Sequence, residues 1–256
     1  MDRPHSRPTG PAITSGATVT ANLPAPAESG TPIIIEARDL YLSFGQTPAL
    51  RGASLTVREG EIVAVMGPSG SGKSTLLHCL AGILVPEQGE VWFAGQRLDT
   101  LSDDRRSALR RERFGFVFQQ GQLVPELTAE ENVALPLLLS GTRRGAATTA
   151  ARKWFGTLGL DGLERRRSGE LSGGQAQRVA LARGLVAGPE VLFADEPTGS
   201  LDSVSGELVM DLLTAGVREH GTTLVLVTHD ARVAAYADRE VVVRDGKVGT
   251  LTGARP

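Results

Sequence analysis

The residues with the clearest chemistry form a glycine-rich run that ends in lysine and serine. Residues 67–74 read Gly-Pro-Ser-Gly-Ser-Gly-Lys-Ser, between the apolar segment 62–66 and a run of helix formers. Glycines let backbone N–H groups turn toward phosphate oxygens, and a helix that follows points its positive end at the same anion. In such a loop Lys73 reaches the β- and γ-phosphates, and the Ser74 hydroxyl binds Mg²⁺. A flexible glycine–serine turn would require neither the lysine nor the flanking strand and helix. The predicted phosphate-binding residues are Gly67, Pro68, Ser69, Gly70, Ser71, Gly72, Lys73, Ser74 and Thr75.

Two carboxylates end a second apolar segment. Asp195 and Glu196 follow the residues Val-Leu-Phe-Ala at 191–194, which read as a buried strand. Such a strand delivers Asp195 beside the phosphate loop, where it can hold Mg²⁺, usually through water. Glu196 points to the other side and can polarise the attacking water as a general base. A solvated strand end is the alternative, but the apolar run and the earlier phosphate loop favour the catalytic interpretation.

A third motif lies between the first two. Residues 171–175 read Leu-Ser-Gly-Gly-Gln and open a predicted helix, so they predict a second anion site that has no lysine. In isolation the serine could simply be a helix N-cap. Together the three motifs resemble the nucleotide-binding domain of ATP-binding-cassette proteins, and the resemblance covers residues 34–249.

This resemblance implies roles for further residues. Gln119 resembles the glutamine that senses Mg²⁺ and the attacking water, although its neighbour Gln120 leaves that assignment open by one residue. His229 resembles the histidine that contacts the γ-phosphate, and Asp202 belongs to a loop that crosses the dimer interface. Phe44 takes the place of the aromatic residue that stacks on adenine; alone it could equally be a core residue. The signature residues that the resemblance assigns to nucleotide binding are Ser172, Gly173, Gly174 and Gln175.

The family also implies a mechanism and partners. Two cassettes pack head to tail around two ATP molecules, so a chain with one cassette implies a homodimer. Residues 127–138 and 194–202 resemble the lipoprotein-release, macrolide-export and cell-division branch. In that branch the ATPase drives a separate integral-membrane permease at the cytoplasmic face of the cell membrane. The rival is a soluble cassette that acts on nucleic acid or the ribosome. A net charge of −2, one phosphate loop and one cysteine oppose it, so no nucleic acid is expected.

The elements that must position these residues predict an α/β fold. Short apolar strands separated by helices predict a parallel core sheet, the early strands look antiparallel and are joined by turns such as residues 58–61, and a mainly helical insert spans about residues 99–170. The predicted strands are residues 33–40, 53–57, 62–66, 91–93, 114–118, 191–194, 223–227, 240–244 and 247–250. The predicted helices follow residue 74 and cover residues 129–139, 146–158, 174–186, 203–219 and 231–235.

Composition divides the chain into a tail and a domain. Residues 1–31 are rich in Pro, Ala, Thr, Ser and Gly and show no apolar period, which predicts a disordered tail before an ATPase domain at residues 32–256. The hydrophobic fraction of 41% can fill a core, whereas no apolar run approaches the roughly 18 residues of a membrane span. The sequence therefore predicts a soluble ATPase whose membrane role comes through a partner.

Overall fold

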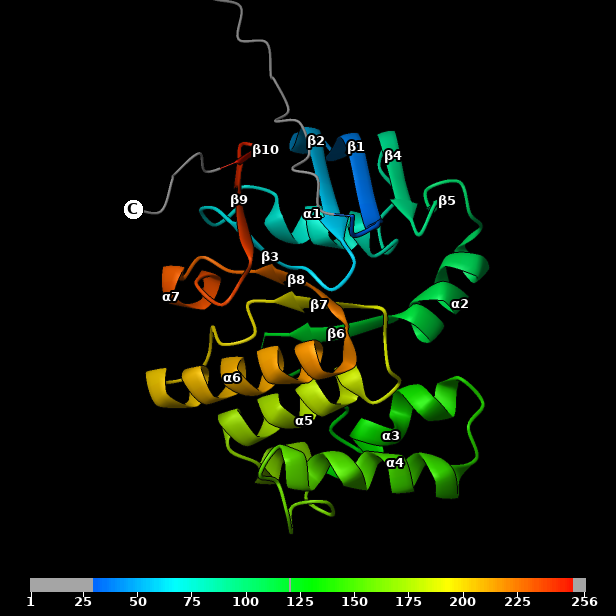
Figure 1. Ribbon diagram of the computed structural model, residues 1–256, viewed down its shortest axis with the longest axis vertical. Coiled ribbons are helices and arrows are strands. Elements are labelled where there is room, and N and C mark those ends of the chain that lie inside the picture. Colours follow the sequence, from blue (N-terminus) through cyan, green and yellow to red (C-terminus); the bar gives the residue numbers. More distant parts are fainter. Residues whose placement is uncertain (1–29, 120, 251–256) are drawn as a thin grey trace, which may run out of the picture. The chain divides into compact units, whose positions relative to one another are not determined.

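The computed structural model describes residues 30–119 and 121–250 (Figure 1). The chain divides into the units Met1–Gly30 and Thr31–Pro256, and the fold below is that of the second unit. The predicted disordered tail, residues 1–31, lies outside the described residues apart from Gly30 and Thr31.

A six-stranded sheet forms the centre of this unit. Its inner strands are short and built from consecutive Val, Leu, Ile and Ala side chains, because both faces of the sheet are covered. The strands are β3 (Ile62–Met66), β6 (Phe114–Phe118), β7 (Val191–Asp195), β8 (Thr223–Val227), β9 (Arg239–Arg244) and β10 (Lys247–Thr250). Their order is β10-β9-β3-β8-β7-β6, and only β10 runs antiparallel to its neighbour.

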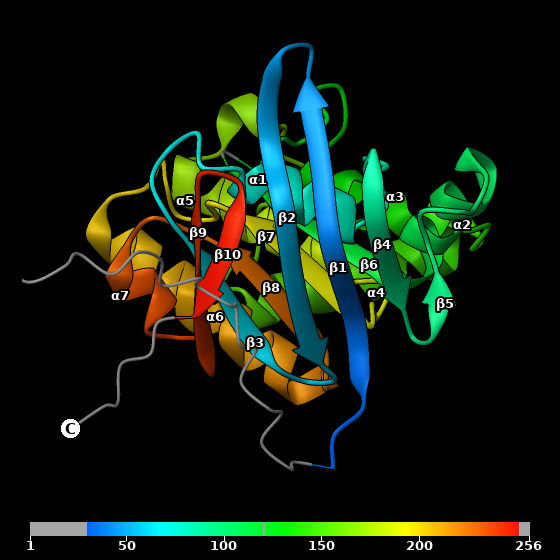
Figure 2. The same cartoon turned by 90° about the horizontal axis from the view of Figure 1, so that it is seen from above.

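A second, antiparallel sheet lies over the first. It consists of β1 (Ile33–Phe44), β2 (Thr47–Arg58), β4 (Gln88–Phe93) and β5 (Gln96–Arg97), in the order β2-β1-β4-β5. A tight turn that contains Gly45, at φ 61°, joins β1 to β2. Figure 2 shows this sheet from above, with α1 and the parallel sheet behind it.

The helices separate and cover the two sheets. Helix α1 lies between them, and its Leu76, Leu77 and Leu80 share one apolar core with both. Helices α5 and α6 cover the other face of the parallel sheet, and α3 and α4 pack beyond α5 around a second core (Figure 1). The helices are α1 (Lys73–Leu80), α2 (Asp103–Arg113), α3 (Ala129–Leu139), α4 (Arg144–Thr157), α5 (Gly173–Leu185), α6 (Ser203–His220) and α7 (Ala231–Ala234).

The predicted α/β fold, with a parallel core sheet, an antiparallel sheet and a helical part, is confirmed. Two local expectations differ. The turn at residues 58–61 does not make a hairpin, because it carries the chain from one sheet to the other. Helix α2 was not predicted, since it buries no residue and has no apolar stripe. The predicted strand at residues 114–118 forms β6 inside the predicted helical insert, so the helices of that insert fall on either side of it.

Helix α5 approaches β6 unusually closely. A Cβ atom at Gly115 in β6 would lie 2.1 Å from the carbonyl oxygen of Gly184 in α5, and one at Gly184 would lie 3.1 Å from the carbonyl oxygen of Phe116. Only glycine fits a backbone–backbone contact of this kind. The paired glycines therefore set the depth at which α5 packs on the sheet.

We predict that Gly115→Ala lowers the free energy of unfolding by about 3 kcal/mol, because the added methyl group must displace backbone rather than a flexible side chain. The matched control is Gly145→Ala in α4, where a Cβ atom meets nothing within 4 Å. This control should be neutral or stabilising by up to about 1 kcal/mol, since alanine has the higher helix propensity. Urea unfolding of both variants measures the difference. Equal effects would show that the Gly115–Gly184 contact is not tight.

Candidate functional site

Four parallel strands bring distant residues to one edge of the central sheet. Phe118 in β6 is in register with Asp195 in β7, which is in register with Val227 in β8, and Val227 pairs with Val65 in β3. Because the strands are parallel, the loops that follow them leave from the same edge. Those loops begin with residues 119, 196, 228 and 67, which brings together four of the predicted site segments.

The phosphate loop is held in shape by its glycines. Gly67 and Gly72 have φ angles of 145° and 104°. A Cβ atom at Gly67 would lie 2.2 Å from the Val243 carbonyl oxygen, and one at Gly72 would lie 2.5 Å from that of Ala49. The loop backbone is thus pressed against neighbouring strands, and no side chain fits at either position.

Lys73 begins α1 and folds back across the loop. Its Nζ donates to the carbonyl oxygens of Gly67 and Pro68, both at 2.9 Å, and the residue is only 8% exposed. Neither acceptor carries a formal charge, so the positive charge of the ammonium group stays available to an anion. Ser74 and Thr75 follow in the first turn of α1, and the loop residues Pro68, Ser69 and Gly70 are exposed.

Ser71 lies deeper in the loop. Its carbonyl oxygen accepts a hydrogen bond from the N–H of Gly246 at 3.0 Å, and its buried hydroxyl oxygen has no hydrogen-bond partner among the described residues. The first bond ties the phosphate loop to the turn between β9 and β10.

The acidic strand end has two different environments. The Oδ1 atom of Asp195 is buried and has no hydrogen-bond partner within the described part of the chain. Glu196 has a φ angle of 48°, and its N–H donates to the Val227 carbonyl oxygen at 2.9 Å. Its Oε1 lies 2.8 Å from Nδ1 of His229, a hydrogen-bonded pair. A left-handed glutamate is uncommon and turns the chain sharply here. The site therefore contains one unpartnered carboxylate and one that a histidine orients.

Gln119 lies beside the loop that follows the acidic pair. A Cβ atom at Gly199 would be 3.0 Å from Nε2 of Gln119 and 3.5 Å from Cβ of Glu196. The side chain of Gln119 is therefore close to the catalytic candidates of β7. Its neighbour Gln120 lies outside the described residues, so the choice between the two stays a prediction.

The second predicted anion site is the start of α5. The Oγ atom of Ser172 accepts from the N–H of Gln175 at 3.3 Å, and Oε1 of Gln175 accepts from the N–H of Ser172 at 2.8 Å. This reciprocal pair is a capping box, which stabilises the helix start and leaves other N–H groups of the first turn free. Gly173 and Gly174 add no side chain in front of it.

The loop at Asp202 lies against this helix start. Cβ atoms at Gly173 and Gly174 would lie 3.5 Å from Leu201 and 3.4 Å from Ser205. Asp202 caps α6, because its Oδ1 accepts from the Ser205 N–H at 3.0 Å and its Oδ2 from the Ser205 hydroxyl at 2.7 Å. These hydrogen bonds lower the pKa of Asp202. Its carboxylate is thus engaged within its own chain.

Phe44 lies at the tip of the β1–β2 hairpin. It is 57% exposed, and its backbone pairs with Thr47. Strand β2 continues past Ala49, whose carbonyl oxygen faces Gly72. An exposed ring on an element that touches the phosphate loop can serve as a stacking platform.

Three polar residues near the site were not predicted from the sequence. Gln177 and Arg183 in α5 donate to backbone carbonyl oxygens around the end of β6. Asn132 in α3 is fully buried and donates to carbonyl oxygens of residues 124, 127 and 128, while its Oδ1 accepts from the Val124 N–H. In the sequence, each of these residues is visible only as a polar side chain within a predicted helix. That pattern does not indicate which backbone carbonyl oxygen the side chain binds.

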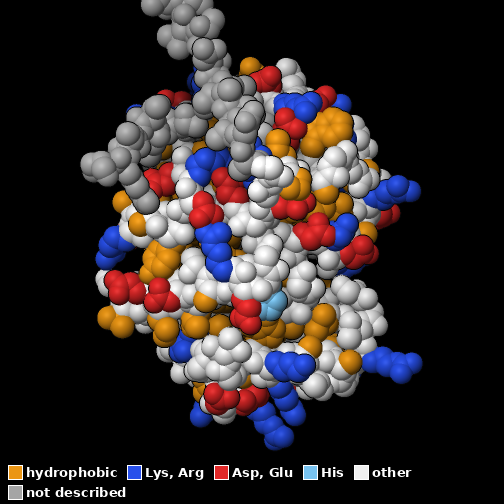
Figure 3. Space-filling view, viewed as in Figure 1, with side chains coloured by type: hydrophobic (Ala, Val, Ile, Leu, Met, Phe, Trp, Pro, Cys, Tyr) orange, Lys and Arg blue, Asp and Glu red, His pale blue; other side chains and the backbone are white. Residues whose placement is uncertain are grey.

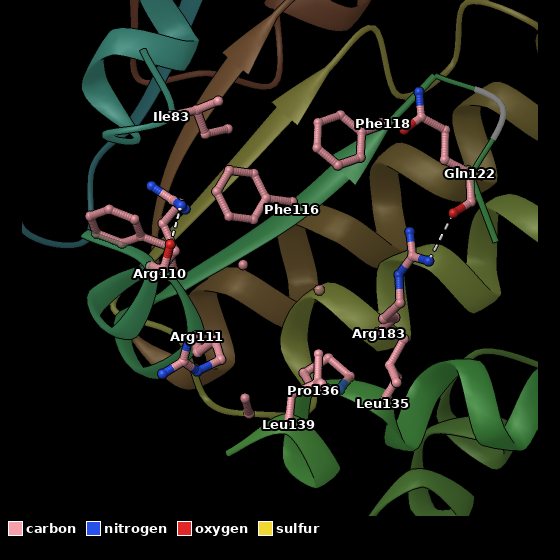
Figure 4. Close-up of a pocket in the computed structure, with 15 residues that line it drawn as sticks. Ile83, Arg110, Arg111, Phe116, Phe118, Gln122, Leu135, Pro136, Leu139 and Arg183 are labelled. Carbon is pink, nitrogen blue, oxygen red and sulfur yellow. Dashed lines mark hydrogen bonds between the residues drawn. The ribbon is translucent and has the colours of Figure 1, made fainter. Parts of the chain in front are cut away.

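A groove of about 500 Å³ opens beside the same loop (Figure 4). Apolar side chains of β6 and α3 line it, including Phe116, Phe118 and Leu135. Arg183 lies at one end, where it is hydrogen bonded to Gln122.

Figure 3 shows acidic and basic side chains interspersed on one face of the molecule, without a region of a single sign.

Comparison with known proteins identifies the family. The family model described as "ABC transporter" matches residues 50–199. The lipoprotein-releasing system ATP-binding protein LolD of Geobacter metallireducens is 44% identical over 219 residues, which are 84% of this chain and 97% of that protein. The macrolide export ATP-binding/permease protein MacB of Photorhabdus laumondii subsp. laumondii is 44% identical over 210 residues, 82% of this chain but only 32% of MacB.

Solved structures agree. The ATP-binding cassette MJ0796, a dimer in a post-hydrolysis state bound to ADP and Pi, matches with a TM-score of 0.78 and 38% identity, over 86% of this chain and 100% of that one. The chain belongs to the ABC transporter family. It is the ATP-binding subunit of an ABC transporter and an ABC ATPase, as the resemblance in its motifs predicts.

A pair of variants separates the two possible uses of Ser172. Asp and Asn cap helices about as well as Ser, so Ser172→Asp and Ser172→Asn should agree in unfolding free energy within about 0.5 kcal/mol. Only the aspartate adds a negative charge at the start of α5. If that helix start binds phosphate, ATP hydrolysis by the Asp variant should fall at least about tenfold below that of the Asn variant. Equal rates would show that α5 does not face the nucleotide.

Proposed function

We propose that this chain hydrolyses ATP to drive a separately encoded integral-membrane permease, in a system of the lipoprotein-release or macrolide-export type. The observation that carries the proposal is the single edge at which β3, β6, β7 and β8 end, with Lys73, Gln119, Glu196 and His229 in the loops beyond. The similarity to LolD and MacB supports the branch.

The proposed division of labour follows from the contacts. Lys73 and the loop N–H groups bind the phosphates, and Phe44 supports the adenine ring by stacking. Glu196 accepts the proton of the attacking water, and His229 holds its carboxylate in place through the 2.8 Å hydrogen bond. Gln119, beside Gly199, orients that water.

The residues fit Mg²⁺ as well as ATP. The buried, unpartnered Oδ1 of Asp195 is costly unless it finds a partner, and a hard cation prefers such an oxygen. Among the described residues there is no group of three or more His, Cys, Asp or Glu that could hold a metal ion. Mg²⁺ commonly binds through one or two carboxylates together with water and substrate phosphates. Ser74, Gln119 and Asp195 would hold the ion. When bound, Mg²⁺ neutralises charge on the β- and γ-phosphates.

We infer that the working unit is a homodimer. The start of α5 is an anion site without lysine, and the loop at Lys73 belongs to a separate helix start, α1. A head-to-tail dimer lets the residues Ser172–Gln175 of one copy close on ATP held by Lys73 of the other. The dimeric MJ0796 cassette supports this arrangement.

The permease partner is proposed from the relatives and from the groove. Within the part of the chain that the structure describes, no helix has the length and apolar character of a membrane span. MacB and the syringafactin exporter SyfD are described as ATP-binding/permease proteins, and this chain matches about a third of each. A permease segment seated in this groove would lie against Phe118 and Gln122, on the two sides of the loop after β6. The proposed location is therefore the cytoplasmic face of the cell membrane.

The arginine-rich helix α2 does not favour a nucleic-acid partner. Arg106 donates to the Leu101 carbonyl oxygen at 2.6 Å and pairs with Asp103 at 3.2 Å. Arg110 donates to the Gly82 carbonyl oxygen and the Ser107 hydroxyl. These guanidinium groups are used within the chain.

We predict that Glu196→Gln retains ATP binding and accumulates a nucleotide-bound dimer, because glutamine keeps the shape of the side chain but cannot accept the proton. Its hydrolysis rate should fall by about 100-fold or more, as for loss of a general base. Nucleotide titration, phosphate release and size-exclusion chromatography with ATP and Mg²⁺ measure the three properties. Lys73→Ala is the contrasting variant and should lose binding. Hydrolysis at the parental rate by Glu196→Gln would refute the assigned base.

We predict that Leu139→Glu weakens binding to permease-containing membrane vesicles at least about tenfold, since truncation or charge at an anchor residue removes much of an interface energy. Leu139 is 62% exposed on the groove, and Ile33, 44% exposed at the start of β1, provides the control variant Ile33→Glu. Cosedimentation with vesicles of the source cells measures binding, with protease-treated vesicles to exclude lipid binding. ATP hydrolysis by the isolated chain should stay unchanged. Equal binding by the two variants would exclude the groove.

A further inference from the structure

Helix α5 holds the loop that follows β6 at three points. Gln177 is 1% exposed, and its Nε2 donates to the carbonyl oxygen of Phe118 at 3.0 Å. Gly121 lies against the helix, since a Cβ atom there would be 3.1 Å from a backbone oxygen of α5. Arg183 donates to the carbonyl oxygens of Gly121 and Gln122 at 2.7 and 2.9 Å. The backbone on both sides of residue 120 is thus fixed to one helix.

The bonds of Arg183 support an unfavourable backbone conformation. Gly121 and Gln122 both have left-handed φ angles, 71° and 43°. For glutamine this conformation costs free energy, and it persists only where the surroundings impose it. The planar guanidinium fork can bond both carbonyl oxygens at once, which an ammonium group cannot do with the same geometry. Burial lowers the pKa of Arg183, yet an arginine stays charged, so its hydrogen bonds are of the strong, charge-assisted kind.

The same helix carries the second anion site at its other end. Helix α5 is a 13-residue helix that begins directly after Ser172, and Arg183 lies in its last turn. A 13-residue helix is a short, continuously hydrogen-bonded segment, so we expect a displacement of its start to carry over to its last turn. A change in the position of Ser172 therefore reaches the loop after β6 through Gln177 and Arg183.

We propose that Arg183 is a positioning residue for Gln119, and that it couples the position of α5 to the hydrolytic edge of the sheet. The inference rests on the proposed roles of Gln119 and Glu196 in ATP hydrolysis. It adds a residue whose hydrogen bonds go to backbone carbonyl oxygens of the loop, through which it acts.

The groove described above lies beside the contact between Arg183 and the loop. Arg183 and Gln122 both line it, and their hydrogen bond lies at its end (Figure 4). A segment seated in the groove would lie against Arg183 and Gln122, and so against the hydrogen bond that joins them. The occupant of the groove and the anion at Ser172 thus act on the same loop from the two ends of α5.

A double-mutant cycle tests the proposal in the full chain. The single variants are Arg183→Met and Gln119→Ala, and the third is their combination. Arg183→Met should lower kcat by about tenfold to a hundredfold, the loss expected when a reacting group is misplaced by about 1 Å. Without Mg²⁺ its affinity for ATP should stay within about twofold, because Lys73 and its loop lie on another element. Arg183→Lys keeps the charge and one donor direction and should recover part of kcat.

The decisive result is the combination. If Arg183 acts through Gln119, Arg183→Met should lower kcat little further in a chain that already carries Gln119→Ala. Losses that multiply would overturn the proposal, as would an Arg183→Met variant with parental kcat. If Gln119→Ala itself keeps parental kcat, the proposed role of Gln119 fails and the inference fails with it.

Hydrogen exchange supplies a readout independent of activity. The amides of Gly121 and Val124 are hydrogen bonded in this loop, to Phe118 and Asn132. In Arg183→Met, exchange in residues 119–128 should accelerate by about tenfold or more, the scale of losing charged hydrogen bonds. Residues 62–73 should be unaffected.

The matched control is Arg178→Met on the same helix. Arg178 donates to the carbonyl oxygens of Leu158 and Gly159 at 2.8 and 3.2 Å, so its loss should accelerate exchange around residues 158–163 instead. Acceleration spread evenly over the chain in Arg183→Met would indicate a general loss of stability and would overturn the positioning role.

Discussion

The site depends on the hydrogen-bonded ladder of parallel strands β3, β8, β7 and β6. Its register holds Val65, Val227, Asp195 and Phe118 side by side, and four loops of the site start from that line. A slip of one residue in β7 would move the Asp195 side chain to the other face of the sheet, because side chains alternate along a strand. Two apolar cores, one on each face of the sheet, oppose such a slip by burying most side chains of these strands. Apolar packing within the sheet thus sets the positions of the side chains in the loops at its edge, which make few contacts of their own.

The parts of this site that could be predicted from the sequence are those whose residues are consecutive and carry their own chemistry. The loop at residues 67–74 combines glycines, a lysine and a serine within eight residues. The acidic pair directly follows an apolar run that is typical of a strand buried on both faces. The parallel order follows from strands that alternate with helices, and the structure confirms it. In each case the physical cause acts over a few residues, so the pattern survives in the sequence.

The remainder could not be predicted because its partners are backbone atoms. Gln177, Arg183 and Asn132 bond to carbonyl oxygens, which every residue has, so nothing in the sequence indicates which loop each side chain holds. Helix α2 was not predicted from the sequence for a different reason. All of its residues are at least partly exposed, and a helix without a buried stripe has no apolar period. The close backbone contact between Gly115 and Gly184 likewise depends on how β6 and α5 pack together, so neither segment alone predicts it. The same holds for the register between distant strands.

The choice of cap residues decides which helix start can receive an anion. Helices α5 and α6 begin next to one another, since Gly174 lies against Ser205. Asp202 caps α6 with a carboxylate whose pKa is lowered by its hydrogen bonds, so it stays ionised and neutralises the positive end of that helix. Ser172 caps α5 with a neutral hydroxyl, which satisfies an N–H group without adding negative charge. Of two adjacent helix ends with similar geometry, only that of α5 keeps its positive potential. The two adjacent helix starts therefore differ in charge, and the one with the neutral cap belongs to the helix that also holds the loop beside Gln119.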